Sequence, residues 1–171
     1  STSQADRLTG TSRMPSCTEA VAFLSTRPRG ATTPEVADAL GISEGRVRQD
    51  MSIVRAWLGD NPATGRKFLP GATESPQAVE RGVGLYLIED LLCDADLFKR
   101  LRLRGEARGS DGIDDLRTAL RLVNGAPYDG LRARGGSWLA ENRHDQYLLC
   151  SIVDVAHLVS TIALAAGNLQ Q

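Results

Sequence analysis

Apolar residues recur at spacings of three and four over most of the chain, which is the period of helices that bury one face. In the first half this pattern predicts three helices, over residues 15–26, 34–40 and 44–58. The third carries its apolar side chains at successive spacings of four, three and four, namely Val47, Met51, Val54 and Leu58. The chain is therefore expected to be mainly α.

Residues 33–58 carry the local signals of a helix-turn-helix. Thr32 or Thr33 can cap the second helix, because a threonine hydroxyl accepts from the N–H groups that the first turn leaves unpaired. Gly41 can adopt the left-handed backbone conformation of a tight turn, and Ser43 can cap the third helix. This motif is the commonest means of laying a helix in the DNA major groove.

Two short apolar segments follow the third helix. Residues 66–69 and 83–88 are strand candidates, and the polar stretch 70–81 separates them. A β-hairpin directly after a recognition helix is the wing of a winged helix. The first half is therefore predicted to be a winged helix-turn-helix with a short β-hairpin.

The second half is predicted to be entirely helical. Two helices are expected over 94–104 and 113–123, followed by a long helical stretch over 138–166 in which Asn142 is the point of a break. From 147 to 165 this stretch is apolar nearly all round, which predicts a central buried helix. Paired helices of this kind are compatible with degenerate tetratricopeptide-like (TPR-like) packing.

The length of 171 residues suits two small domains. Residues 1–14 are polar and aperiodic, and they are expected to be a flexible tail. The winged-helix domain is then expected over 15–92 and the helical domain over 93–171.

Composition narrows the chemistry. The formal net charge is −1, so any DNA-binding surface must be a local cluster of cations rather than a basic domain. Cys17, Cys93 and Cys150 lie far apart, which favours reduced, buried thiols in a cytosolic protein. His144 and His157 lack a zinc-ligand spacing, and no nucleotide-binding or nucleophile motif occurs. We expect no catalytic residue, cofactor or metal, no membrane-spanning segment, no enzymatic activity, and a cytoplasmic location even where a longer parent protein is membrane-anchored.

The candidate DNA-binding site lies on the third helix and the wing. Arginine can pair with guanine and glutamine with adenine, and both can hold phosphate. The residues expected to face DNA are Arg46, Arg48, Gln49, Ser52 and Arg55 on the helix, with Arg66 and Lys67 on the wing. Glu44 and Asp50 lie on the same helix and oppose this interpretation. A continuous positive stripe would favour DNA, whereas interleaved acids would favour a protein partner.

Several segments resemble the actinobacterial SARP-type regulators, which join a winged helix to a bacterial transcriptional activator domain (BTAD). They are RVRQDMSIVRAWLG, GVGLYLI, DADLF, LRTALRLVNGAPYDGL and the long stretch that begins WLAENRHDQYLLC. The resemblance implies a DNA-binding winged helix followed by a helical, TPR-like BTAD.

The sequence thus predicts a transcriptional regulator module. It would bind double-stranded DNA through its winged helix and use its helical domain for oligomerisation or partner contact, with no membrane contact. The alternative is a protein–protein interaction module whose winged helix does not bind DNA. A small-molecule sensor with a pocket between its long helices is a more distant option.

Overall fold

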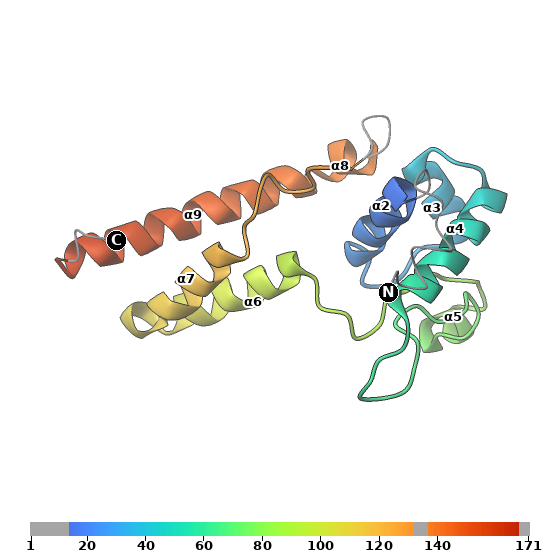
Figure 1. The fold of residues 1–171 in the computed structure, drawn as a ribbon, viewed down its shortest axis with the longest axis horizontal. Coiled ribbons are helices and arrows are strands. Elements are labelled where there is room, and N and C mark those ends of the chain that lie inside the picture. Colours follow the sequence, from blue (N-terminus) through green and yellow to red (C-terminus); the bar gives the residue numbers. More distant parts are fainter. Residues whose placement is uncertain (1–13, 132–136, 168–171) are drawn as a thin grey trace, which may run out of the picture. The chain divides into compact units, whose positions relative to one another are not determined.

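The computed structural model describes residues 14–131 and 137–167 and divides into two compact units (Figure 1). The first unit takes in the described residues up to Leu91 together with Gly130–Asn142. The second takes in Leu92–Asp129 and the described residues from Arg143 onward. Segment 130–142 therefore belongs with the first unit, although both segments that flank it belong to the second.

Three mutually packed helices form the centre of the first unit: α2 (Met14–Ser25), α3 (Thr33–Leu40) and α4 (Glu44–Leu58). Two shorter helices belong to the same unit, α5 (Pro76–Arg81) and α8 (Ser137–Asn142), and α8 packs on α3. The largest fully buried side chains of this unit include Phe23, Leu40, Met51, Leu69, Leu85 and Trp138.

The helix-turn-helix forms with the predicted local chemistry. Thr32 caps α3 through a capping box, in which its hydroxyl accepts from the Glu35 N–H while the Glu35 carboxylate accepts from the Thr32 N–H. Gly41 ends α3 with φ 62°, in the left-handed region that a glycine adopts without strain. The hydroxyl of Ser43 then accepts from the Arg46 N–H at the start of α4.

The predicted wing, and with it the winged-helix assignment, is wrong. No strand forms in the described residues, and segments 66–69 and 83–88 take part only in isolated bridges, Lys67 with Asp60 and Tyr86 with Ala31. Ser75 and Pro76 start α5 inside the stretch expected to be the loop of the hairpin. The two segments instead fill the first unit, where Leu69 and Leu85 are buried. Burial between helices and loops thus displaces pairing between the two segments.

The second unit consists of a helical hairpin and one long helix that packs against it. Helix α6 (Asp94–Ala107) leads through a 3₁₀ turn (Gly109–Gly112) into α7 (Ile113–Arg121), and the two lie side by side (Figure 1). The end of α6 and the turn before α7 meet so closely that a Cβ at Gly112 would overlap the backbone carbonyl of Gly105. Paired helices were expected in this half, and the hairpin agrees with that part of the prediction.

The long helix differs from the prediction in one respect. It breaks where expected, because Arg143 has φ 51° and separates α8 from α9 (His144–Ala165). The expectation that it is a central buried helix is wrong, since Val155 alone is fully buried among the residues described for α9. One face packs against α7, while Tyr147, Leu149, Val153 and Leu164 are 50–70% exposed.

Candidate functional site

Helix α4 presents a small polar face to solvent. Val47, Met51 and Val54 are buried against the rest of the first unit. Arg48, Gln49 and Ser52 are exposed on the opposite side. Of the seven predicted DNA-binding residues, these three lie together on an open surface.

Arg46 is part of a buried polar link. Its Nε donates to Asp50 Oδ1 over 2.8 Å, and the Asp50 side chain is wholly buried. The hydroxyl of Ser16 on α2 donates to the other oxygen of Asp50, also over 2.8 Å. If Arg46 turned toward a phosphate, Asp50 would be left as a buried charge with one hydrogen bond fewer, which is costly. Arg46 therefore serves the packing of α2 on α4.

Arg55 is also committed to the fold. Its Nε donates to the Leu69 carbonyl over 2.9 Å and its Nη2 to the Pro70 carbonyl over 3.1 Å. These bonds fasten the segment that follows α4 onto the side of that helix. The sequence signal that could have indicated this role is the place of Arg55 directly after Val54, one of the apolar positions of the helix, and Arg55 is half-buried in the structure.

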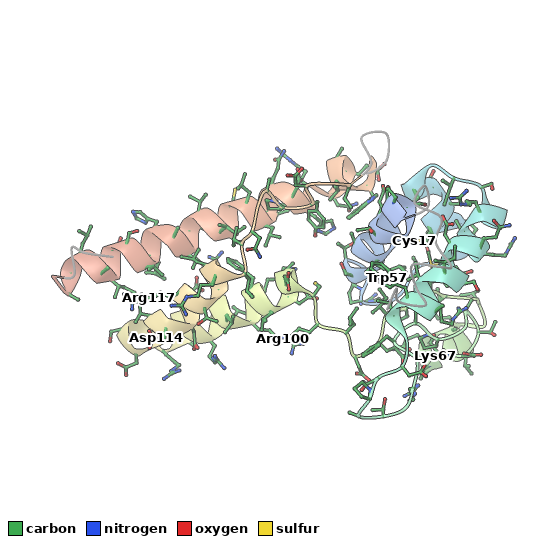
Figure 2. The ribbon with its side chains drawn as sticks, in the orientation of Figure 1. Cys17, Trp57, Lys67, Arg100, Asp114 and Arg117 are labelled. Carbon is green, nitrogen blue, oxygen red and sulfur yellow. The ribbon has the colours of Figure 1, made fainter. Side chains whose placement is uncertain are left out.

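The other three predicted cations form exposed ion pairs. Arg48 Nη2 lies 3.0 Å from Glu44 Oε2, one helical turn away. Lys67 Nζ lies 2.8 Å from Asp60 Oδ1, and Arg66 Nη2 lies 3.4 Å from Glu89 Oε2. Figure 2 labels Lys67 on the loop after α4 and Trp57 on α4 itself, where the Trp57 side chain is 40% exposed.

The sequence left open whether the predicted cations form a continuous positive stripe or alternate with acids, and these contacts distinguish the two arrangements. Carboxylates lie beside Arg46, Arg48, Arg66 and Lys67, and Arg55 faces two carbonyl oxygens. The acids are therefore interleaved with the cations. A continuous positive stripe is not formed on this part of the molecule.

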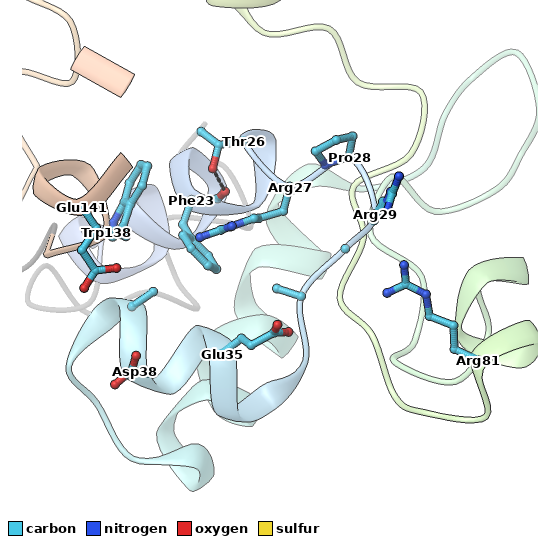
Figure 3. A pocket seen from close by; sticks show the side chains of 13 residues that line it. Phe23, Thr26, Arg27, Pro28, Arg29, Glu35, Asp38, Arg81, Trp138 and Glu141 are labelled. Atoms are coloured by element: carbon cyan, nitrogen blue, oxygen red, sulfur yellow. Dashed lines mark hydrogen bonds between the residues drawn. The ribbon is translucent and has the colours of Figure 1, made fainter. Parts of the chain in front are cut away.

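A pocket of about 410 Å³ opens in the first unit, between the end of α2, α3 and α8 (Figure 3). Its apolar wall is Phe23, which meets Trp138 edge to face with ring centroids 5.4 Å apart and carries the Arg27 guanidinium 4.8 Å above its ring. The Nε of Arg27 is buried and has no hydrogen bond to the described residues. The charged lining is balanced, with three arginines and three carboxylates: Arg27, Arg29, Arg81, Glu35, Asp38 and Glu141.

The Glu35 carboxylate lines this pocket and belongs to the capping box of α3. The backbone N–H and hydroxyl of Thr32 both donate to it, over 2.7 and 2.8 Å, and hold the pKa of its carboxyl below the usual range. The positive charges of Arg27 and Arg81 act in the same direction. Glu35 thus stays ionised as part of the capping box of α3.

The arginine-rich stretch on α6 is held by acids of its own unit. Arg104 donates to both oxygens of Asp115, over 2.7 and 2.5 Å, and Arg108 lies 3.4 Å from the same carboxylate. The bond from Arg104 lowers the pKa of the Asp115 carboxyl, and that carboxylate raises the pKa of Arg104. Lys99 and Arg102 pair with Asp96 and Glu106, so this stretch is an ion-paired helix face.

The exposed face of α9 is a feature that the sequence interpretation missed. By length and composition alone the helix could cross a membrane, but the core helix of a soluble protein meets the same criteria, so the expectation of no membrane-spanning segment stays a prediction. Cys150 lies on this exposed face, whereas Cys17 is buried and Cys93 half-buried. The missed signal was a second set of positions spaced by three and four, on the side of the helix opposite Val155.

Neither a protein-family model, nor a curated protein, nor a solved structure matches this chain, and the resemblance to SARP-type regulators stays a prediction.

Proposed function

We propose that this chain is a non-enzymatic protein-interaction module whose helix-turn-helix is a packing unit rather than a DNA reader. The observation that carries this proposal is that carboxylates and backbone carbonyls of the chain itself engage the predicted DNA-binding cations. Affinity for DNA comes largely from lysines and arginines that neutralise phosphates. Here Arg46 and Arg55 are fixed by internal bonds, and carboxylates cancel much of the field of Arg48, Arg66 and Lys67.

A second observation supports a protein partner. The exposed side of α9 carries Tyr147, Leu149, Val153 and Leu164, of which the least exposed is still 50% accessible. Apolar side chains that stay exposed together along one helix mark contact surfaces more often than isolated ones do. The contact surface of the module is therefore assigned to the second unit.

The test is a duplex-selection and binding experiment on the intact chain. We expect no sequence to be enriched from a random duplex pool, and an affinity for a duplex of about 25 base pairs that is weaker than about 10 µM at physiological salt. Arg48→Ala on α4 and Arg100→Ala on α6 should have equally small effects, because each removes one exposed positive charge. Enrichment of a defined site, together with loss of binding in Arg48→Ala but not in Arg100→Ala, would overturn the proposal.

DNA recognition by α4 is the second candidate function. It is favoured by the open polar face of Arg48, Gln49 and Ser52, whose groups can bond base edges, and by the well-capped turn before it. It would rely on the helix-turn-helix alone, since no wing forms in the described residues. The resemblance to SARP-type regulators supports this candidate, and the selection experiment discriminates the two.

A further inference from the structure

The exposed face of α9 contains a regular line of side chains, which we call the outer seam. Its members follow one another at spacings of four, three, four, three and four, and all are exposed: Gln146, Cys150, Val153, His157, Ser160 and Leu164. This is the spacing by which one helix packs lengthwise against another. The outer seam therefore has the geometry of a helix-pairing surface.

The opposite side of α9 is already occupied. Val155 is buried, and Leu148, Ile152, Val159 and Ile162 pack with it against the cluster formed by α6 and α7. The two sets of positions alternate along the helix, so the outer seam faces away from that cluster. A helix that covered the outer seam would not compete with the packing of the second unit.

We propose that the outer seam binds the same seam of a second copy of this chain, with the two α9 helices antiparallel. This inference rests on the proposed function, because it names the partner of the interaction module. The order of spacings is the same in both directions, as a two-fold symmetric interface requires. In the matching register Gln146 faces Leu164, Cys150 faces Ser160 and Val153 faces His157 of the other copy.

The polar groups on this face are complementary in the same register, because an imidazole N–H can donate to a carboxylate. Asp154 and His157 are the titratable side chains of α9 beside the middle of the seam, and both are exposed. The antiparallel register brings Asp154 of each copy next to His157 of the other, which gives two identical contacts. A parallel pair would instead set each residue beside its own equivalent, Asp154 beside Asp154. Arg102 lies 3.5 Å from Asp154 on the flank of the seam and can remain paired there.

Lipid is a poorer occupant of this face than a second copy. Asp154 lies at the midpoint of α9, and a carboxylate at the centre of a membrane-spanning helix costs about 2.5–3.5 kcal/mol even on the lowest scale. The face that packs on α6 and α7 would also have to separate from them. A protein surface can accept the polar members of the seam at its edges, where water reaches them.

The surface area that α9 can bury in the dimer sets the expected affinity of self-association. A helix of 22 residues is about 33 Å long, and a strip of that length along one helix face lies below the size of most stable interfaces. We therefore expect a weak dimer, with a dissociation constant in the micromolar range.

The first test is the oligomeric state of the intact chain by sedimentation velocity, from about 5 to about 500 µM, which brackets that range. Val153→Lys and Leu164→Glu should each raise the dimer dissociation constant about tenfold or more. The matched control is Leu103→Glu on α6, because Leu103 is 67% exposed and Leu164 is 62% exposed. The control should dimerise as the unchanged chain does, and circular dichroism should show the same helical content in all variants.

The second test fixes the register. Asp154→Arg and His157→Glu should each weaken self-association, because the first replaces the acceptor of the His157 N–H by a cation and the second sets a glutamate beside Asp154 of the other copy. Mixing these two variants should restore the dimer, since the arginine introduced in one copy would meet the glutamate introduced in the other while the second contact stays native. The register can also be tested by cross-linking in a Cys93→Ser background. Mild oxidation of the Ser160→Cys variant should join Cys150 of one copy to the introduced cysteine of the other, whereas the chain without Ser160→Cys should not cross-link through Cys150.

Three results would overturn the inference. They are a monomer at every concentration, a dimer insensitive to both seam substitutions, and binding of the chain to phosphatidylcholine–phosphatidylglycerol vesicles in place of dimerisation. Cross-linking through Cys150 alone would contradict the antiparallel arrangement. None of these outcomes depends on DNA, so the inference can fail while the proposed function stands, and the duplex selection can overturn the proposed function independently.

Discussion

Individual charged residues in this protein act mainly on its own structure. Asp50 joins Ser16 and Arg46 in the first unit, and Asp115 joins Arg104 and Arg108 in the second. Each carboxylate lies on the inner side of its helix, and its side chain is at most 12% exposed. A sequence shows that arginines and acids share a helix, but their pairing depends on side-chain direction and on the neighbouring helix. Helix α4 carries the five helix residues that were predicted to face DNA, but the contacts of their side chains could not be foreseen from the sequence.

Asp115 should make the stability of the second unit depend on pH. Its pKa is lowered in the folded chain, chiefly by the bond from Arg104, so its contribution is fully present above the carboxyl pKa of the unfolded chain. That contribution is lost as the pH falls below about 4 and through the lower folded-state pKa. Asp115→Asn should therefore be less stable than the unchanged chain at pH 7, and the difference should shrink toward pH 3. Urea unfolding followed by circular dichroism at several pH values measures this, and a difference independent of pH would contradict it.

At the scale of helices and turns, local chemistry was predictable and long-range pairing was not. The bounds of α3 and α4 and their caps follow from Thr32, Gly41 and Ser43, whose effects reach only a few residues. The wing failed because strand pairing depends on distant segments, and Tyr86 pairs with Ala31 instead. Ser75 and Pro76 have the sequence of a helix start, inside the stretch that was predicted to be a loop. The apolar composition of α9 predicted burial, although composition does not determine what covers a helix.

The turn between α6 and α7 should tolerate no side chain at its closest point. A Cβ at Gly112 would overlap the carbonyl of Gly105, and a Cβ at Gly105 would lie 2.7 Å from the Leu116 side chain. Gly112→Ala should therefore lower the free energy of unfolding of the second unit by about 3 kcal/mol, the upper end for overpacked sites. Gly125→Ala is the control, because an added Cβ there meets nothing within 4 Å. Equal stability of the two variants in urea unfolding would show that the hairpin can open without cost.

At the scale of the whole molecule, the two units do not follow the order of the chain. Segment 130–142 carries α8 back into the first unit, where Trp138 is 1% exposed and packs on Phe23. The sequence predicts a domain boundary after residue 92, and the first change of unit falls after Leu91. The return of α8 to the first unit leaves no signal in the periodicity of apolar residues. Trp138 lies in a segment flanked by residues of the second unit, so only its contacts show that it belongs to the first unit.

Removal of Trp138 should accordingly weaken the first unit and spare the second. Trp138→Ala should cost about 3–5 kcal/mol, as truncation of a buried aromatic side chain does. Trp57→Ala on α4 is the matched control, because its ring is 40% exposed and its loss should cost much less. Amide hydrogen exchange locates the effect, and we expect faster exchange in α2 and α3 of Trp138→Ala, with α6, α7 and Val155 on α9 unchanged. If protection fell equally in all these helices, the two units would unfold as one cooperative body. The helix-turn-helix unit and the interaction unit would then not be independently stable.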